Sequence, residues 1–176
     1  MFIAKLYKFI LWIFEIMDCC IIIRGPAGVG KTTIAKSLAE RLRAAYFSFD
    51  ELMEANGLDV IIDDGIPPEN FLEANRLLLP MVLDKELVVL DGCFYRKEQL
   101  DDMLNNVSGM RVYIFTLTAE IETCLERNRL RKNPLMDNDI RQVYDLVSKL
   151  NVGMIIDTTG KTVEQSVLEI LNHMNR

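Results

Sequence analysis

Short apolar runs alternate with amphipathic stretches along this chain of 176 residues. Five apolar runs have the length of a strand, at 19–23, 46–49, 87–90, 111–117 and 154–156. Between them, apolar residues recur every three or four positions, which predicts helices over 34–42, 71–83, 100–107, 121–130, 140–150 and 163–174. Strands that alternate with helices predict an α/β fold, in which helices cover both faces of a parallel sheet.

The borders of these elements carry further signals. Pro67 and Pro68 suit the start of a helix, and Thr162 with Gln165 forms a capping-box pattern before the last helix. The strands are nearly continuous runs of Val, Ile and Leu, as in sheets buried on both faces. Because ligands of parallel sheets bind beyond the carboxyl ends of the strands, we expect the residues after the five runs to share one cleft.

Residues 25–32, directly after the first run, read GPAGVGKT, which is the pattern of a phosphate-binding P-loop. The motif lies between a strand and a helix, the context that it requires. Its glycines let backbone N–H groups turn toward an anion, and the helix start adds the positive end of a dipole. Lys31 is expected to reach the β- and γ-phosphates, and the Thr32 hydroxyl to bind Mg²⁺. The predicted nucleotide contacts are Gly25, Ala27, Gly28, Val29, Gly30, Lys31, Thr32 and Thr33.

Asp91 closes the third apolar run, and Gly92 follows it. An acid at the end of a hydrophobic strand is typical of a Walker B site, which holds Mg²⁺ directly or through water. A simple cap of the following turn is the alternative interpretation. Hydrolytic motor ATPases usually carry a Glu at the place of Gly92 to activate water, and no Asn-Lys-x-Asp guanine motif occurs. The pattern therefore favours transfer to an acceptor other than water.

Asp50 follows the second run and is the candidate for orienting or deprotonating an acceptor hydroxyl. It could instead form the N-cap of a helix over 51–54, and the two roles are compatible. Gly92 and Arg96 follow the third run and are further candidates for binding the acceptor. Arg96 would suit an anionic group of that acceptor.

A basic stretch at 127–132 ends the helix predicted over 121–130. Arg127 and Arg131 are four residues apart, so we expect them to share one helical face. Two guanidinium groups on one face could clamp phosphates and stabilise the charge that develops during transfer. A solvated helix end is the alternative, but a local basic cluster in a chain of net charge −6 favours function.

Together these residues resemble the adenylate-kinase-like branch of P-loop kinases, which includes nucleoside monophosphate, shikimate and gluconate kinases and chloramphenicol phosphotransferase. The similarity spans 17–176 and rests on the P-loop, Asp50, the Asp91–Gly92 turn and the arginines 127 and 131. It implies a three-layer P-loop NTPase fold with a five-stranded parallel sheet in the order 2-3-1-4-5. It also implies ATP and Mg²⁺ as cofactors, a lid near 127–137, and an adenine that lies against the loop of Thr159.

The chain also departs from the named members of that branch. Adenylate kinases have Asp-Gly-Phe-Pro-Arg after the third strand, whereas residues 91–96 read DGCFYR. The Asp-x-Asp of shikimate kinases after the second strand is missing too, so the acceptor of those enzymes does not carry over. The leading hypothesis is an ATP-dependent kinase of a small hydroxylated metabolite, nucleoside or nucleotide, with Lys31, Asp50, Arg127 and Arg131 as catalytic residues. The alternatives are a polynucleotide 5′-kinase and a nucleotide-binding module without transfer activity.

Residues 1–16 are an apolar extension unlike the rest of the chain. They could form a short amphipathic helix, or they could be a start-site artefact with Met17 as the natural first residue, which is the favoured interpretation. The run between Lys8 and Glu15 is too short to span a bilayer, and no signal cleavage site follows it. Residues 17–176 are expected to form a single kinase domain.

Charge and cysteine content narrow the expected partners. A net charge of −6 argues against stable binding of nucleic acid. The four cysteines lack C-x-x-C spacing, which indicates reduced thiols in a cytoplasmic protein, with Cys93 as the candidate for reactivity. The expected partners are ATP and a small-molecule acceptor, and the oligomeric state is left open.

Overall fold

In the computed structural model, which describes residues 18–60 and 66–175, five strands form one parallel sheet. The strands are β1 (Cys19–Arg24), β2 (Ala45–Ser48), β3 (Leu87–Gly92), β4 (Arg111–Thr118) and β5 (Met154–Asp157). They lie in the order β2-β3-β1-β4-β5, and every pairing is parallel. The predicted fold class and strand order are confirmed, whereas the expectations for residues 1–16 fall outside the described residues.

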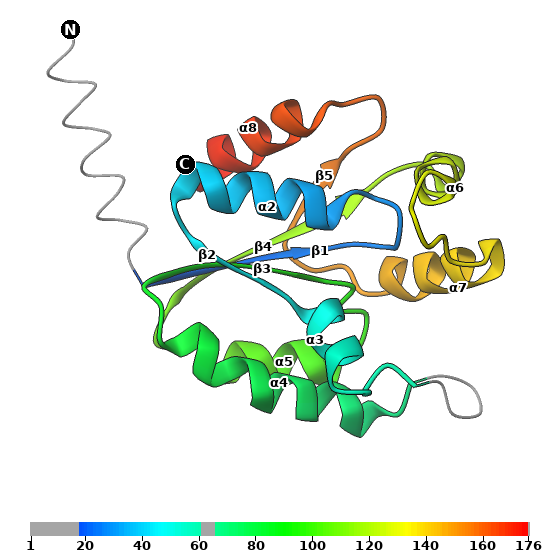
Figure 1. Ribbon diagram of the computed structural model, residues 1–176. Helices are drawn as coiled ribbons and strands as arrows, with labels where there is room; N and C mark the ends of the chain where they lie inside the picture. The colour runs from blue at the N-terminus through cyan, green and yellow to red at the C-terminus, as the bar shows by residue number, and fades with distance from the viewer. Residues whose placement is uncertain (1–17, 61–65, 176) are drawn as a thin grey trace, which may run out of the picture.

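Helices cover both faces of the sheet in the described part of the chain. They are α2 (Lys31–Leu42), α3 (Phe49–Ala55), α4 (Pro68–Leu83), α5 (Lys97–Asn106), α6 (Ile121–Arg129), α7 (Asp137–Ser148) and α8 (Val163–Met174). Helices α2 and α8 lie on one face, and α4 and α5 lie on the other (Figure 1). None of the helices in 18–60 and 66–175 is long and apolar enough to cross a membrane.

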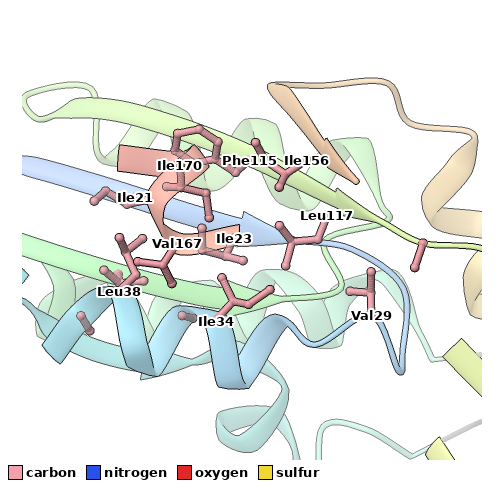
Figure 2. Close-up of a cluster of buried hydrophobic side chains, with 14 of the residues drawn as sticks. Ile21, Ile23, Val29, Ile34, Leu38, Phe115, Leu117, Ile156, Val167 and Ile170 are labelled. Carbon is pink, nitrogen blue, oxygen red and sulfur yellow. The ribbon is translucent and has the colours of Figure 1, made fainter. Parts of the chain in front are cut away.

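The central strand β1 is buried along its whole length, and its side chains alternate between two apolar clusters. Ile21 and Ile23 pack with α2 and α8, and Figure 2 shows Ile34, Val167 and Ile170 in the same cluster. The other cluster holds Cys20 and Ile22 with residues of α3, α4 and α5. Burial on both faces explains why the strand is a continuous apolar run in the sequence.

Several helix boundaries agree with their sequence signals. Pro68 begins α4, as its fixed backbone angle favours. The Thr162 side chain accepts a hydrogen bond from the Gln165 N–H, and the Gln165 side chain accepts one in return, so the predicted capping box is present.

The start of α3 differs from the expectation. Phe49 begins the helix, and the Ser48 hydroxyl accepts a hydrogen bond from the Glu51 N–H at 3.3 Å. Ser48 is therefore the N-cap, and the interpretation of Asp50 as a cap is wrong. Asp50 lies in the first helical turn, where its side chain is free for other contacts.

Candidate active site

The loop between β1 and α2 has the shape that its glycines allow. Gly28 and Gly30 have φ angles of 80° and 97°, which residues with a side chain rarely adopt. Among the described residues, no side chain caps the N-terminus of α2, and no acid lies in its first turn. The backbone N–H groups at this end are therefore suited to bind a phosphate. The predicted contacts lie in this loop or in the first turn of α2: Gly25, Ala27, Gly28, Val29, Gly30, Lys31, Thr32 and Thr33.

Lys31 lies at the centre of the site and is only 7% exposed. Its Nζ donates to the Pro26 carbonyl oxygen at 3.1 Å and lies 3.9 Å from Asp50 Oδ2. Burial disfavours the charged ammonium, but the neighbouring Cys93, Asp50 and Asp91 outweigh this effect and raise the pKa of Lys31. The side chain therefore stays cationic, as a phosphate ligand must be.

Asp91 is fully buried at the end of β3 and accepts two hydrogen bonds from hydroxyl groups. Thr32 Oγ1 donates to Oδ2 at 2.8 Å, and the Tyr46 hydroxyl donates to Oδ1 at 2.7 Å. Burial raises the pKa of Asp91, and the two hydroxyls and the charge of Lys31 oppose that rise. The Thr32 hydroxyl and the Asp91 carboxylate, both predicted to bind Mg²⁺, therefore lie in direct contact.

Tyr46 is a site residue that the sequence did not reveal. It lies in β2 opposite Val89, two residues before Asp91 on the neighbouring strand β3. Side chains two residues apart on a strand share one face, so the tyrosine reaches Asp91 diagonally across the two strands. Its ring also lies under Lys36 Nζ, which is 5.2 Å from the ring centroid.

Thr32 and Asp91 can hold Mg²⁺. Their oxygen atoms lie 2.8 Å apart at the start of α2, and Mg²⁺ prefers oxygen ligands. The described part of the chain has no group of three or more His, Cys, Asp or Glu that could bind a metal. This donor set fits a cation that takes its remaining ligands from phosphate and water, as Mg²⁺ usually does.

Asp50 lies between Lys31 and the turn after β3. Its Oδ1 accepts a hydrogen bond from the Cys93 N–H at 3.2 Å, and its side chain is 48% exposed. The other oxygen, Oδ2, accepts a hydrogen bond from the Cys93 thiol at 3.6 Å and lies 3.9 Å from Lys31 Nζ, so both oxygens face protein groups while about half of the side chain stays accessible. Gly92 packs tightly here, because a Cβ at this position would lie 2.8 Å from Phe49 Cβ.

Cys93 is not an activated thiol. Burial, together with the negative charge of Asp50, raises the pKa of Cys93 to about 12. The thiol is therefore neutral near pH 7, and the prediction that Cys93 is reactive is not supported. All four cysteines of the chain are free.

Arg96 is engaged within the protein. Its guanidinium donates to the Ile66 carbonyl oxygen at 2.9 Å. The guanidinium carbon also lies 5.2 Å from the ring centroid of Phe71 and 5.8 Å from that of Tyr95. These contacts place Arg96 beside the turn after β3, with its charge stacked on aromatic rings.

Arg127 joins α6 to two loops of the site. Its guanidinium donates to the Val29 carbonyl oxygen at 3.1 Å and to the Thr158 hydroxyl and carbonyl oxygens, both at 3.0 Å. Thr159, the next residue, accepts a hydrogen bond from the Glu120 N–H at 3.1 Å. The loop after β5 and the P-loop are therefore held together through Arg127.

Arg131 lies elsewhere than the helical spacing predicts. Helix α6 ends at Arg129, so Arg131 follows the helix and does not share its face with Arg127. The end of α6 is held by Arg129, which pairs with Asp137 at 2.7 Å. Residues 130–136, which connect α6 to α7, are exposed. The prediction of one face with two arginines is wrong, because the helix stops before the second.

Arg24 is a second residue that the sequence did not reveal. It precedes the P-loop and is fully buried, yet it has four hydrogen bonds. It donates to the carbonyl oxygens of Phe94 (3.2 Å), Leu150 (2.7 Å) and Val147 (3.1 Å), and to the Thr116 hydroxyl (3.0 Å). Val147 lies in the last turn of α7, where free carbonyls and the helix dipole favour a cation.

The P-loop after β1, the acid that ends β3 and the strand order together define a P-loop kinase of the adenylate-kinase-like type. A family model described as an AAA domain matches residues 21–146, and the chain belongs to that family.

Individual relatives agree with this class. The chain is 31% identical over 168 residues to a protein of Pyrococcus furiosus provisionally named an adenylate kinase, covering 88% of this chain and 83% of that protein. It is 29% identical over 160 residues to shikimate kinase 1 of Yersinia enterocolitica, with 85% and 90% covered. The crystal structure of a gluconokinase from Sinorhizobium meliloti matches with a TM-score of 0.71 at 14% identity, over 90% of this chain and 92% of that one. The last match shows the fold alone.

Proposed function

We propose that this protein uses ATP to phosphorylate a small hydroxylated molecule. The observation that carries the proposal is the approach of Asp50 to Lys31, with 3.9 Å between Oδ2 and Nζ. The cation of the P-loop thus lies beside a half-exposed carboxylate, so a donor phosphate and an acceptor hydroxyl can be held side by side. The relatives named as adenylate and shikimate kinases support the same chemistry.

Each part of the site has a role in this proposal. Lys31 and the N-terminus of α2 bind the β- and γ-phosphates, and Thr32 and Asp91 hold Mg²⁺, which neutralises phosphate charge when it is bound. Asp50 orients the acceptor hydroxyl and accepts its proton. Arg127 and Arg131 belong to the lid side, where a guanidinium can stabilise the transferred group.

The close packing of Gly92 supports transfer over hydrolysis. A side chain at position 92 would collide with Phe49, so this position cannot carry a residue that activates water.

The cytoplasm is the expected location of the protein, because it uses ATP in this proposal and its four cysteines are free.

The test is phosphoryl transfer from labelled ATP to a panel of hydroxylated acceptors. We expect Lys31→Ala to lose both ATP binding and transfer. Asp50→Asn should keep ATP binding and lower transfer by about 10²-fold or more, because the proton acceptor is lost. Asp84→Asn, an exposed substitution at the end of α4, is the matched control and should behave like the parent. Parent-like transfer by Asp50→Asn would remove Asp50 from the mechanism, and hydrolysis without transfer to any acceptor would contradict the proposal.

A further inference from the structure

The turn after β3 brings a thiol into contact with both charged groups of the proposed active site. Lys31 Nζ donates a hydrogen bond to Cys93 Sγ at 3.6 Å, and the thiol donates one to Asp50 Oδ2, also at 3.6 Å. Burial raises the pKa of Cys93 to about 12, so near pH 7 the sulfur keeps its proton and can both donate and accept. Cys93 therefore links the phosphate-binding lysine to the carboxylate that is proposed to accept the hydroxyl proton.

Lys31 and Asp50 lie close together but do not form a direct hydrogen bond. Nζ and Oδ2 are 3.9 Å apart, whereas a charge-assisted hydrogen bond between an ammonium and a carboxylate is about 2.8 Å long. Each group has uncharged partners instead. Lys31 Nζ also donates to the Pro26 carbonyl oxygen at 3.1 Å, and Asp50 Oδ1 accepts from the Cys93 N–H at 3.2 Å. The backbone and the thiol of Cys93 thus hold one oxygen each of the Asp50 carboxylate.

The backbone on both sides of Cys93 is fixed by close packing. Gly92 has no room for a side chain, because a Cβ there would lie 2.8 Å from Phe49 Cβ. Phe94 is buried and has a φ angle of 42°, a left-handed conformation that is unfavourable for a residue with a side chain. Its ring centroid lies 5.0 Å from that of Phe49, and its carbonyl oxygen accepts a hydrogen bond from Arg24 Nε at 3.2 Å. Such a conformation persists only where surrounding contacts hold it, so tertiary packing defines the position of Cys93.

Building on the proposed function, we infer that Cys93 is a positioning residue, whose thiol keeps Lys31 and Asp50 from forming a direct ion pair. A direct pair would occupy both the lysine that binds phosphate and the carboxylate that accepts the proton. A hydrogen bond to a neutral sulfur is weaker than one between two charged groups, so Lys31 can exchange it more easily for the phosphates of ATP. Cys93 acts through these two residues and takes no chemical step itself.

The crystal structure of the ATP-free Cys93→Ala variant, compared with that of the parent, is the first test. The substitution removes the sulfur but leaves the backbone N–H that binds Asp50 Oδ1. We expect Lys31 Nζ and Asp50 Oδ2 to approach to about 2.8–3.0 Å, from 3.9 Å. An unchanged distance would overturn the inference, whether or not the protein is a kinase.

Kinetics with labelled ATP, and an acceptor that the parent phosphorylates, are the second test. Cys93→Ala should raise KM for ATP about threefold or more, because a direct ion pair competes with the phosphates, and lower kcat about fivefold, because the carboxylate loses a donor. Cys93→Ser should recover most of both values, since a hydroxyl can also accept from Lys31 and donate to Asp50. Cys20→Ala, a buried cysteine of β1 within an apolar cluster, is the matched control and should change neither value.

The possible results separate this inference from the proposed function. If the parent transfers phosphate and Cys93→Ala matches it in kcat and KM, the inference is wrong and the kinase proposal stands. Equal defects in Cys93→Ala and Cys93→Ser would also contradict it, because hydrogen bonding by the side chain would then have no role. If Cys93→Ala does not fold, Cys93→Val, which fills the space without a donor, replaces it in the kinetic test and should lower kcat similarly. If the parent binds ATP but transfers phosphate to no acceptor, the proposed function fails, and the distance between Lys31 and Asp50 alone decides the inference.

Discussion

Among single residues, Asp91 depends most on its surroundings. A buried carboxylate is costly unless donors satisfy it, and Thr32 and Tyr46 supply two hydroxyl donors. Because each hydroxyl holds a different oxygen atom, the carboxylate has one orientation, with Oδ2 toward Thr32. Tyr46 thus holds the Asp91 carboxylate in the orientation that the proposed Mg²⁺ site requires.

Replacement of Tyr46 by Phe removes one of these donors. We expect the free energy of unfolding to fall by about 1 kcal/mol. We also expect a several-fold higher Mg²⁺ concentration for half-maximal transfer, and a smaller rise in melting temperature on adding Mg²⁺ with ADP. Tyr113→Phe, in β4, is the control. An Mg²⁺ requirement unchanged from the parent would show that Tyr46 does not position Asp91.

Cys93 leads to a prediction about pH. Since its pKa is raised from 9.0 to about 12, the thiolate is scarce at pH values near 8 in the folded protein. Alkylation of Cys93 by iodoacetamide, followed by mass spectrometry, should therefore be about 10²-fold slower in the native protein than in urea. Asp50→Asn removes one cause of the raised pKa and should speed the reaction. Rapid native alkylation at that pH would contradict the assigned environment.

Among the elements, the contact between the P-loop and α6 determines the shape of the donor site. A Cβ on Gly28 would lie 2.3 Å from the Cys124 carbonyl oxygen, and Arg127 of the same helix holds the Val29 carbonyl. The loop is thus fitted to a helix about a hundred residues away in the sequence. The glycine pattern predicted a phosphate-binding loop, whereas the close packing of this loop against α6 became visible only in the structure.

Gly28→Ala should therefore be far more damaging than a usual glycine substitution. We expect a loss of about 3 kcal/mol or more in the free energy of unfolding, with loss of ATP binding, because backbone must move. Gly57→Ala is a matched control, since Gly57 also has a positive φ of 64° but nothing lies within 4 Å of its Cβ position. It should cost only about 1 kcal/mol. Urea unfolding compares the two, and equal losses would refute the steric explanation.

For the molecule as a whole, Arg24 connects parts that the chain order keeps apart. Its guanidinium joins the end of β1 to the turn after β3, to β4 and to the end of α7. Burial lowers the pKa of Arg24, and no acid is among its hydrogen-bond partners in the described residues. Carbonyl oxygens, including those at the end of α7, offset the cost of its burial.

Arg24→Met should leave three carbonyl oxygens, two of them in buried contacts, without this donor. We expect a loss of about 3 kcal/mol in the free energy of unfolding, measured with urea. Arg24→Lys should recover part of this loss, since it retains the charge but not the fork of donors. Arg111→Met, at the exposed start of β4, should change stability by less than about 0.5 kcal/mol. A stable Arg24→Met variant would mean that other donors replace the guanidinium.

Those parts of the protein that depend on local patterns could be predicted from the amino-acid sequence. Continuous apolar runs predicted the five strands, and the P-loop and Asp91 followed from short motifs at strand ends, where backbone geometry restricts the residue types. Helix ends were less certain, because they depend on one or two capping residues. Ser48 displaced Asp50 as a cap, and α6 stopped before Arg131.

The contacts between these residues, in contrast, depend on how the whole chain folds. The contacts of Tyr46 with Asp91, of Arg24 with Val147 and of Arg127 with Thr158 join residues that are 45, 123 and 31 positions apart. Such contacts depend on strand order, register and packing, which no local pattern contains. The proposed ATP-binding half of the site could therefore be predicted from the Gly-rich motif alone. The position of Asp50 could not be predicted in this way, because the packing of α3 brings it to 3.9 Å from Lys31.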